Sequence, residues 1–248
     1  MHRTLLTRLR YVWLAALLAG FGVVQANAAD EPPDLTGVWT NYREPGQPRF
    51  GGGPQGELPL KPEARQKIDQ YRALVAETGD TPGGHCLGTG RPGSMLGSGG
   101  YPMEIVQRPE QLTIVYEAHN EIRRVYLGDR NMPEGDRIPD RNGYSSGRWE
   151  DDTLVVETTH LKEQVDQRYA HSDQAHIVER YRLTTDAAGA RVLVAEMTMT
   201  DPVFYTAPVT AEKKWAQVPS GHLLPYECNE PDWLDHLERL REQQSGAH

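Results

Sequence analysis

Apolar and polar residues alternate through three consecutive segments in the middle of the chain. The segments are MEIVQ (103–107), QLTIVYE (111–117) and IRRVYLG (122–128), with Pro109-Glu110 and His119-Asn120 as the turns between them. With these turns, Met103 faces Tyr116, and Tyr116 faces Arg123. One face then collects Met103, Ile105, Leu112, Ile114, Tyr116, Val125 and Leu127. Because a slip of one residue would mix the two faces, the pattern predicts an antiparallel meander with one buried face.

Further segments of strand type continue to residue 218. They are LTGVWTN (35–41), YSSGRWE (144–150), TLVVETT (153–159), HIVERYRLTT (176–185), RVLVAEMTMT (191–200) and EKKWAQV (212–218). The turn Asp151-Asp152 places Trp149 opposite Leu154. In the long hairpin, a turn at Ala188-Gly189 groups Glu179, Tyr181, Leu183, Val194 and Glu196 on one face, and His176, Val178, Arg180, Met197 and Met199 on the other. This pattern leaves open which of the two faces is buried.

A glycine- and proline-rich insertion at about residues 43–101 separates the first strand from the meander. Within it, a helix is expected from Pro62-Glu63 to Gly79, and residues 231–243 predict a second one. About nine sequential antiparallel strands leave two exposed edges unless the sheet closes. The sequence therefore predicts an all-β, up-and-down barrel with a helical insertion, and a β-sandwich is the alternative. A barrel of this size has room for side chains or one small ligand.

The first 28 residues have the pattern of a cleavable secretory signal peptide. Three arginines precede an apolar stretch at 11–24, and Ala26-Asn27-Ala28 provides the small residues of a cleavage site. The apolar stretch is shorter than the roughly 20 residues that cross a bilayer as a helix. We therefore expect a periplasmic or secreted protein in which residues 29–248 form a single barrel domain, with no membrane attachment after cleavage.

The composition of the chain limits which classes of partner and cofactor are expected. The chain has a formal net charge of −9, and nucleic-acid binding needs clustered Lys and Arg, so nucleic acid is disfavoured. Cys86 and Cys228 are the two cysteines. In an oxidising compartment a disulfide between them is the simplest interpretation, and a catalytic thiol or a metal ligand is the alternative. Since metal-site spacings and phosphate-binding motifs are absent from the sequence, we expect no metal and no cofactor.

Two resemblances to known families add expectations. Leu35-Thr36-Gly37-Val38-Trp39 resembles the Gly-x-Trp strand that opens many lipocalins and other calycins. The segment YSSGRWEDDTLVVET (144–158) is similar to one typical of a large, mostly uncharacterised family of secreted bacterial proteins, although Asp151 stands where that family usually has glycine. The same family resemblance extends to Pro102-x-Glu104-Ile105, His171-Ser172, Val178-Glu179-Arg180, and Asp201-Pro202 with Tyr205. It implies a shared fold and secretion, and no particular reaction.

Several polar side chains fall on the apolar faces of the predicted strands. Arg123 shares a face with Tyr116, and Glu179 shares one with Tyr181. A buried carboxylate needs a partner or takes up a proton, so Arg123 and Glu179 are expected to form either a structural ion pair or the polar floor of a pocket. The candidate ligand-binding residues are Tyr116, Arg123, Trp149 and Tyr181, with His171 at the mouth of the barrel.

The leading hypothesis is an exported β-barrel that encloses a small apolar or aromatic ligand. The alternative is a cofactor-independent isomerase, lyase or hydrolase in the same cavity, with His171 and Glu179 as the catalytic acid and base. In a third hypothesis, the long loops and the acidic surface bind a partner in the cell envelope. The sequence specifies neither the ligand nor the oligomeric state.

Overall fold

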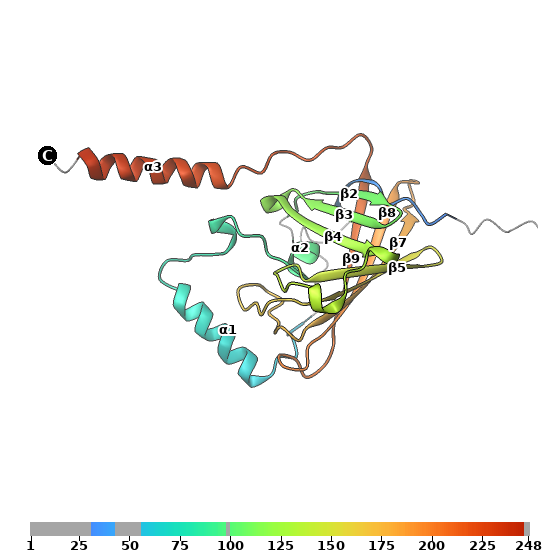
Figure 1. Cartoon of the computed structure of the whole chain (residues 1–248), viewed down its shortest axis with the longest axis horizontal. Helices are drawn as coiled ribbons and strands as arrows, with labels where there is room; N and C mark the ends of the chain where they lie inside the picture. Colours follow the sequence, from blue (N-terminus) through green and yellow to red (C-terminus); the bar gives the residue numbers. More distant parts are fainter. Residues whose placement is uncertain (1–30, 43–55, 98–99, 246–248) are drawn as a thin grey trace, which may run out of the picture. The chain divides into compact units, whose positions relative to one another are not determined.

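Nine strands form one closed sheet in the order in which they occur along the chain (Figure 1). The computed structural model describes residues 31–42, 56–97 and 100–245, so the predicted signal peptide at 1–28 lies outside the described residues. The strands are β1 (Gly37–Asn41), β2 (Met103–Arg108), β3 (Gln111–Tyr116), β4 (Glu121–Leu127), β5 (Tyr144–Glu150), β6 (Thr153–Thr159), β7 (His176–Thr185), β8 (Arg191–Thr200) and β9 (Val209–Val218).

The sheet closes because β1 pairs with both β2 and β9. The predicted barrel is therefore confirmed, and the β-sandwich alternative is wrong. All neighbouring strands are antiparallel except β4 and β5, where Val125 pairs with Ser145 in parallel. The prediction of a purely up-and-down barrel is wrong at this pair. Parallel neighbours need a long crossover, and the connection 128–143 returns the chain to the end of the barrel at which β4 begins.

The first meander follows the predicted faces, although one turn differs. The pairing of Met103 with Tyr116 is confirmed. Arg123 pairs with Ile114 rather than with Tyr116, because the turn between β3 and β4 spans residues 117–120 and is centred one residue earlier than predicted. His119 adopts a left-handed conformation in that turn, with φ 60°. Since a shift of two residues keeps every side chain on its face, Arg123 still points into the barrel.

The long hairpin of β7 and β8 has a different register from the predicted one. Glu179 pairs with Met197, and the predicted grouping of Glu179 with Glu196 is wrong. The turn has an odd number of residues, because Asp186 N donates to Ala190 O at 3.0 Å and leaves three residues between them. A shift of one residue exchanges the faces of a strand. Met197 therefore shares the barrel interior with Glu179, and Glu196 points outward.

The two ends of the barrel interior differ in polarity. One end is apolar and contains the buried residues Leu112, Val125, Leu127, Leu154 and Leu193. The other end, which we call the α2 end, contains the first residues of β2, β4 and β7 and receives the short helix α2 (Gly93–Gly97). There Ser94 Oγ hydrogen-bonds to Glu121, and Met95 Sδ lies 3.7 Å from the hydroxyl of Tyr181. The insertion after the first strand thus returns to the barrel.

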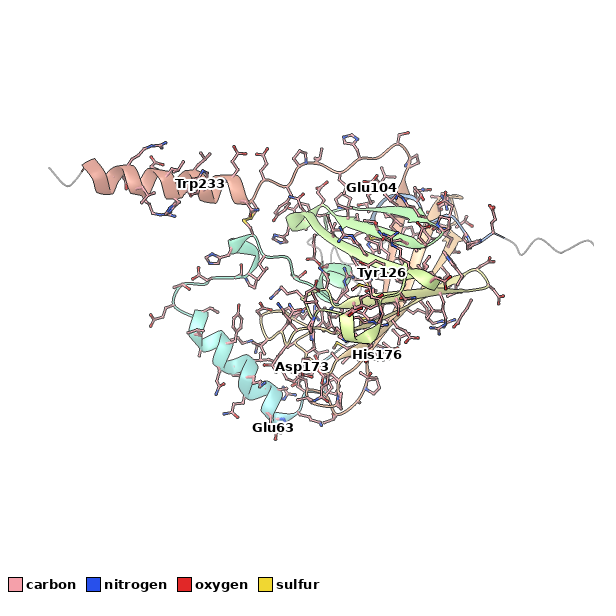
Figure 2. The ribbon with its side chains drawn as sticks, in the orientation of Figure 1. Glu63, Glu104, Tyr126, Asp173, His176 and Trp233 are labelled. Atoms are coloured by element: carbon pink, nitrogen blue, oxygen red, sulfur yellow. A yellow bond between two sulfur atoms is a disulfide. The ribbon has the colours of Figure 1, made fainter. Side chains whose placement is uncertain are left out.

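Two longer helices lie outside the sheet. Helix α1 (Pro62–Val75) begins at the predicted residue and ends before the predicted Gly79. Helix α3 (Asn229–Ser245) includes the predicted C-terminal helix. The disulfide Cys86–Cys228 joins the insertion to the residue before α3, as predicted (Figure 2). Among the described helices, none combines the length and the apolar character that crossing a membrane requires.

Candidate functional site

A network of polar side chains is centred on Arg123 inside the barrel. Arg123 Nε donates to Ser145 Oγ at 3.0 Å, and Arg123 Nη2 donates to Thr158 Oγ1 at 2.9 Å. Arg123 Nη2 also forms an ion pair with Glu179, and Nη1 lies 3.3 Å from the hydroxyl of Tyr181. These residues come from β4, β5, β6 and β7, and all of them are buried. The structure therefore brings together three predicted site residues, Arg123, Glu179 and Tyr181.

The charges of this network follow from its burial. Burial is the largest single effect and disfavours the charged form of Arg123, but Glu179, Tyr181 and Tyr116 together outweigh it and raise the pKa of Arg123 above its ordinary value. Burial also raises the pKa of Tyr181 well above its ordinary value, and the negative charge of Glu179 adds to the increase. Tyr181 is therefore a neutral phenol at physiological pH, and it donates to Glu179 Oε1 at 3.2 Å.

Arg91 brings a second guanidinium to the network from the insertion. Its side chain is completely buried, and Nη1 lies 3.9 Å from Glu179 Oε1. The guanidinium carbon lies 4.9 Å from the centre of the Tyr116 ring, and Nε donates weakly to Asn142 at 3.5 Å. Neither Nη1 nor Nη2 has a hydrogen-bond partner in the described structure. Since buried polar groups are nearly always paired, this guanidinium requires an explanation.

His171 holds the backbone of Arg91 rather than lining the barrel. His171 is completely buried, with Nε2 2.9 Å from the carbonyl oxygen of Arg91 and Nδ1 3.0 Å from that of Ser172. Burial lowers the pKa of His171, so the neutral ring, with one donor, is favoured. Gln167 Nε2 donates to the same Arg91 oxygen at 3.1 Å. His171 therefore lies beneath the loop that carries Arg91, and not at an open mouth as predicted.

Other motifs of the family resemblance form a buried hydrogen-bonded cluster. Asp201 accepts from the backbone nitrogen of Ser172 at 2.6 Å and from its hydroxyl at 2.8 Å. It also accepts from the backbone nitrogen of Phe204 at 3.0 Å. Tyr205 donates to the carbonyl oxygen of Ala170 at 2.6 Å. These motifs fix the conformation of two connecting loops.

The C-terminal segment 221–228 crosses residues at the α2 end of the barrel. Leu224 N donates to Glu117 Oε2 at 2.7 Å, and Asn120 Nδ2 donates to the carbonyl oxygen of Tyr226 at 3.0 Å. The Tyr226 ring contacts Tyr101, with ring centres 5.5 Å apart. The disulfide then joins this segment to the insertion. Two segments that are distant in sequence thus meet near the same end of the barrel.

Two further predicted site residues occupy different regions of the interior. Tyr116 is buried beside Arg91 at the α2 end. Trp149 is half-buried and pairs with Leu154, as predicted. It lies four positions beyond Ser145 along β5, which corresponds to about 13 Å of strand. Trp149 therefore packs against the core at the apolar end and is not part of the polar network.

The sequence analysis missed Lys213, which lies on the inward face of β9. Two other inward positions of β9, Val209 and Trp215, are buried, and Lys213 is only 6 % exposed. Burial lowers the pKa of Lys213 to about 8. Within the described part of the chain, its ammonium has no hydrogen bond and no ion pair. The alternation with Trp215 was the signal that could have identified this residue.

Replacing Lys213 with Met is expected to stabilise the protein without ligand by about 2 kcal/mol at pH 7, because the substitution removes an unpaired buried ammonium. The folded pKa lies below the unfolded value, so the unfolded chain binds more protons above pH 8 and the stability of the native protein rises with pH there. The advantage of Lys213→Met should therefore shrink between pH 8 and pH 10. Urea unfolding measures both effects, and Lys214→Met, on the outward face, is the control.

Three cavities are lined by described residues. A groove of about 520 Å³ includes His160, Lys162 and His176, and one of about 330 Å³ borders α1. A cavity of about 70 Å³ lies between α2 and Tyr116. None of these three cavities is lined by Arg123 or Glu179. In the described residues, no group of three or more His, Cys, Asp or Glu could hold a metal ion.

The network is chemically suited to binding polar groups. Both ring nitrogens of His171 face backbone carbonyls, and Glu179 is engaged by Arg123 and Tyr181. In comparisons with known proteins, no family model matches the chain and no curated protein matches it at a significant level.

Proposed function

We propose that the protein binds one small molecule with an apolar or aromatic body inside the barrel. The observation that carries this proposal is the guanidinium of Arg91, which is fully buried while both of its terminal nitrogens lack a partner. A ligand at the α2 end would supply the missing acceptor. The apolar end of the interior would accommodate the rest of the molecule. A barrel of nine strands is of the size that encloses either side chains or one small ligand.

Entry of a ligand would require α2 to move. Met95 of α2 is completely buried and contacts the hydroxyl of Tyr181, so it occupies space at the polar end of the bore. The cavity of about 70 Å³ borders Ser94 of α2 on one side and Tyr116 on the other. Displacement of α2 from this cavity would open the interior beside Arg91. The ligand would then occupy the space that Met95 vacates, and the strands would keep their positions.

The neutral fluorescent probe N-phenyl-1-naphthylamine tests the proposal. We expect saturable binding of one probe per chain, with quenching of the buried Trp39 and Trp215. Ala195 is completely buried on the inward face of β8, and Ala195→Leu should weaken binding by at least about tenfold because it fills the bore. Thr198→Leu, on the exposed face of the same strand, is the matched control. Absence of saturable binding, or equal binding by both variants, would overturn an interior site.

We propose that this binding takes place outside the cytoplasm. The support is the predicted signal peptide together with a disulfide, since disulfides persist in oxidising compartments. The resemblance of segment 144–158 to a family of secreted bacterial proteins points the same way. The N-terminal residue of the protein recovered from its native compartment is expected to be Ala29. A chain that retains residues 1–28 and lacks the disulfide would contradict export.

A further inference from the structure

Resting on the proposed binding function, we infer that the ligand carries an acidic group, a carboxylate or a similar oxyanion, which Arg91 and Lys213 bind at the α2 end of the barrel. The buried charged side chains described are Arg91, Glu117, Arg123, Glu179, Asp201 and Lys213. All three acids in this set accept hydrogen bonds. Among these groups, the terminal nitrogens of Arg91 lack a hydrogen-bond partner, and Lys213 has neither a hydrogen bond nor an ion pair in the described structure. Both side chains are cationic.

The positions of the two cations can be related through Tyr181. Arg91 Nη1 lies 3.9 Å from Glu179, which in turn accepts from Tyr181. Tyr181 and Lys213 both pair with Ala195, from opposite sides, so their backbones are about two strand spacings or 10 Å apart. The long side chain of Lys213 can therefore approach a group bound by Arg91. Helix α2, which follows Arg91, also contacts β9.

The carboxylates at this end are already engaged. Glu121 accepts from Ser94 Oγ and from the backbone nitrogen of Gly90. Glu117 accepts from Leu224 N at 2.7 Å. No protein oxygen in the described structure compensates Lys213, although the whole chain has a net charge of −9. The positive charge in the bore is therefore a local feature, and it does not follow from the composition.

An oxyanion matches these two cations better than a neutral group does. The two terminal nitrogens of a guanidinium form a planar fork that binds a carboxylate, sulfonate or phosphate through two oxygens. A neutral ligand would leave the Lys213 ammonium buried without a counter-charge, which is costly. The rings of Tyr181 and Trp215 stack with centres 6.4 Å apart and offer an aromatic surface next to this site. The expected ligand is therefore an organic acid with an apolar or aromatic body.

Two fluorescent probes that differ in one group provide the test. 8-Anilinonaphthalene-1-sulfonate is N-phenyl-1-naphthylamine with an added sulfonate. We expect the native protein to bind the sulfonate probe about tenfold more tightly than the neutral probe, and each probe to displace the other. Arg91→Gln and Lys213→Gln should each remove most of this preference, measured as the ratio of the two affinities in the same variant. Lys214→Gln makes the same charge change on the outward side of β9 and should leave the preference intact.

The possible outcomes distinguish a failure of this inference from a failure of the proposed function. If both probes bind equally and the variants do not differ, the acidic group is wrong and the interior site remains. If neither probe binds, the proposed function itself fails. If the sulfonate probe binds tightly but the neutral probe does not displace it, the sulfonate is bound outside the bore and the inference is overturned. Lys213→Gln keeps the test valid if Arg91→Gln does not fold, because it removes a buried charge that has no partner.

Discussion

Glu179→Gln is expected to lower the free energy of unfolding by about 3–5 kcal/mol. The substitution leaves the Arg123 guanidinium, which is 2 % exposed, without its carboxylate. It also removes the one carboxylate within ion-pair distance of Arg91 among the described residues. A buried charge that loses its partner is far more costly than a broken surface pair, because water cannot replace the lost interaction. Urea unfolding followed by circular dichroism measures the change.

Glu196→Gln is the matched control for this prediction. Glu196 lies on the outward face of β8 and pairs with Arg182 at 3.2 Å, and both side chains are about half exposed. Exposed pairs of this kind contribute about 0–1 kcal/mol. We therefore expect the control to unfold at nearly the same urea concentration as the native protein. Equal losses in the two variants would mean that the interior network contributes no more than a surface pair.

Removal of the disulfide by Cys86→Ser and Cys228→Ser together is expected to cost about 2–5 kcal/mol of stability. The bond joins residues 142 positions apart, and the chain-entropy model gives about 5 kcal/mol for a loop of this length. Its loss would also release the segment 221–228 from the insertion that carries Arg91. We therefore expect faster entry and release of an interior probe in the double variant.

Reduction of the native protein provides an internal control for the disulfide. A reductant should shift the unfolding midpoint of the native protein toward that of the double variant, and it should leave the double variant unchanged. The contacts of Leu224 with Glu117 and of Asn120 with Tyr226 do not depend on the disulfide. If reduced and oxidised native protein unfold at the same urea concentration, these local contacts alone hold the segment in place.

The sequence predicted those parts of the fold in which the alternation of apolar and polar residues determines which face of a strand is buried. The pairing of Met103 with Tyr116 follows from apolar residues on one face of each strand. Arg123 was placed inside for the same reason, and an error of two residues in the register beyond the next turn did not change its face. Lys213 obeys the same alternation with Trp215 and could have been found by testing the faces of β9.

The parts that the sequence did not predict depend on turn geometry and on long-range packing. The odd number of residues between Asp186 and Ala190 changed the face that Glu196 occupies. The parallel pairing of β4 with β5 depends on the path of the connection 128–143, which has no periodic pattern. Arg91 lies in a glycine-rich loop whose return into the barrel is fixed by tertiary contacts with His171 and Gln167. No local pattern around Arg91 signals that path.

A crystal structure of the protein with 8-anilinonaphthalene-1-sulfonate tests the central claim most directly. The account predicts the naphthalene rings inside the barrel, Met95 displaced, and sulfonate oxygens within hydrogen-bond distance of the terminal nitrogens of Arg91. The contradicting result is a probe in the outer groove beside His160 and His176, with Met95 still against Tyr181 and the guanidinium of Arg91 unchanged.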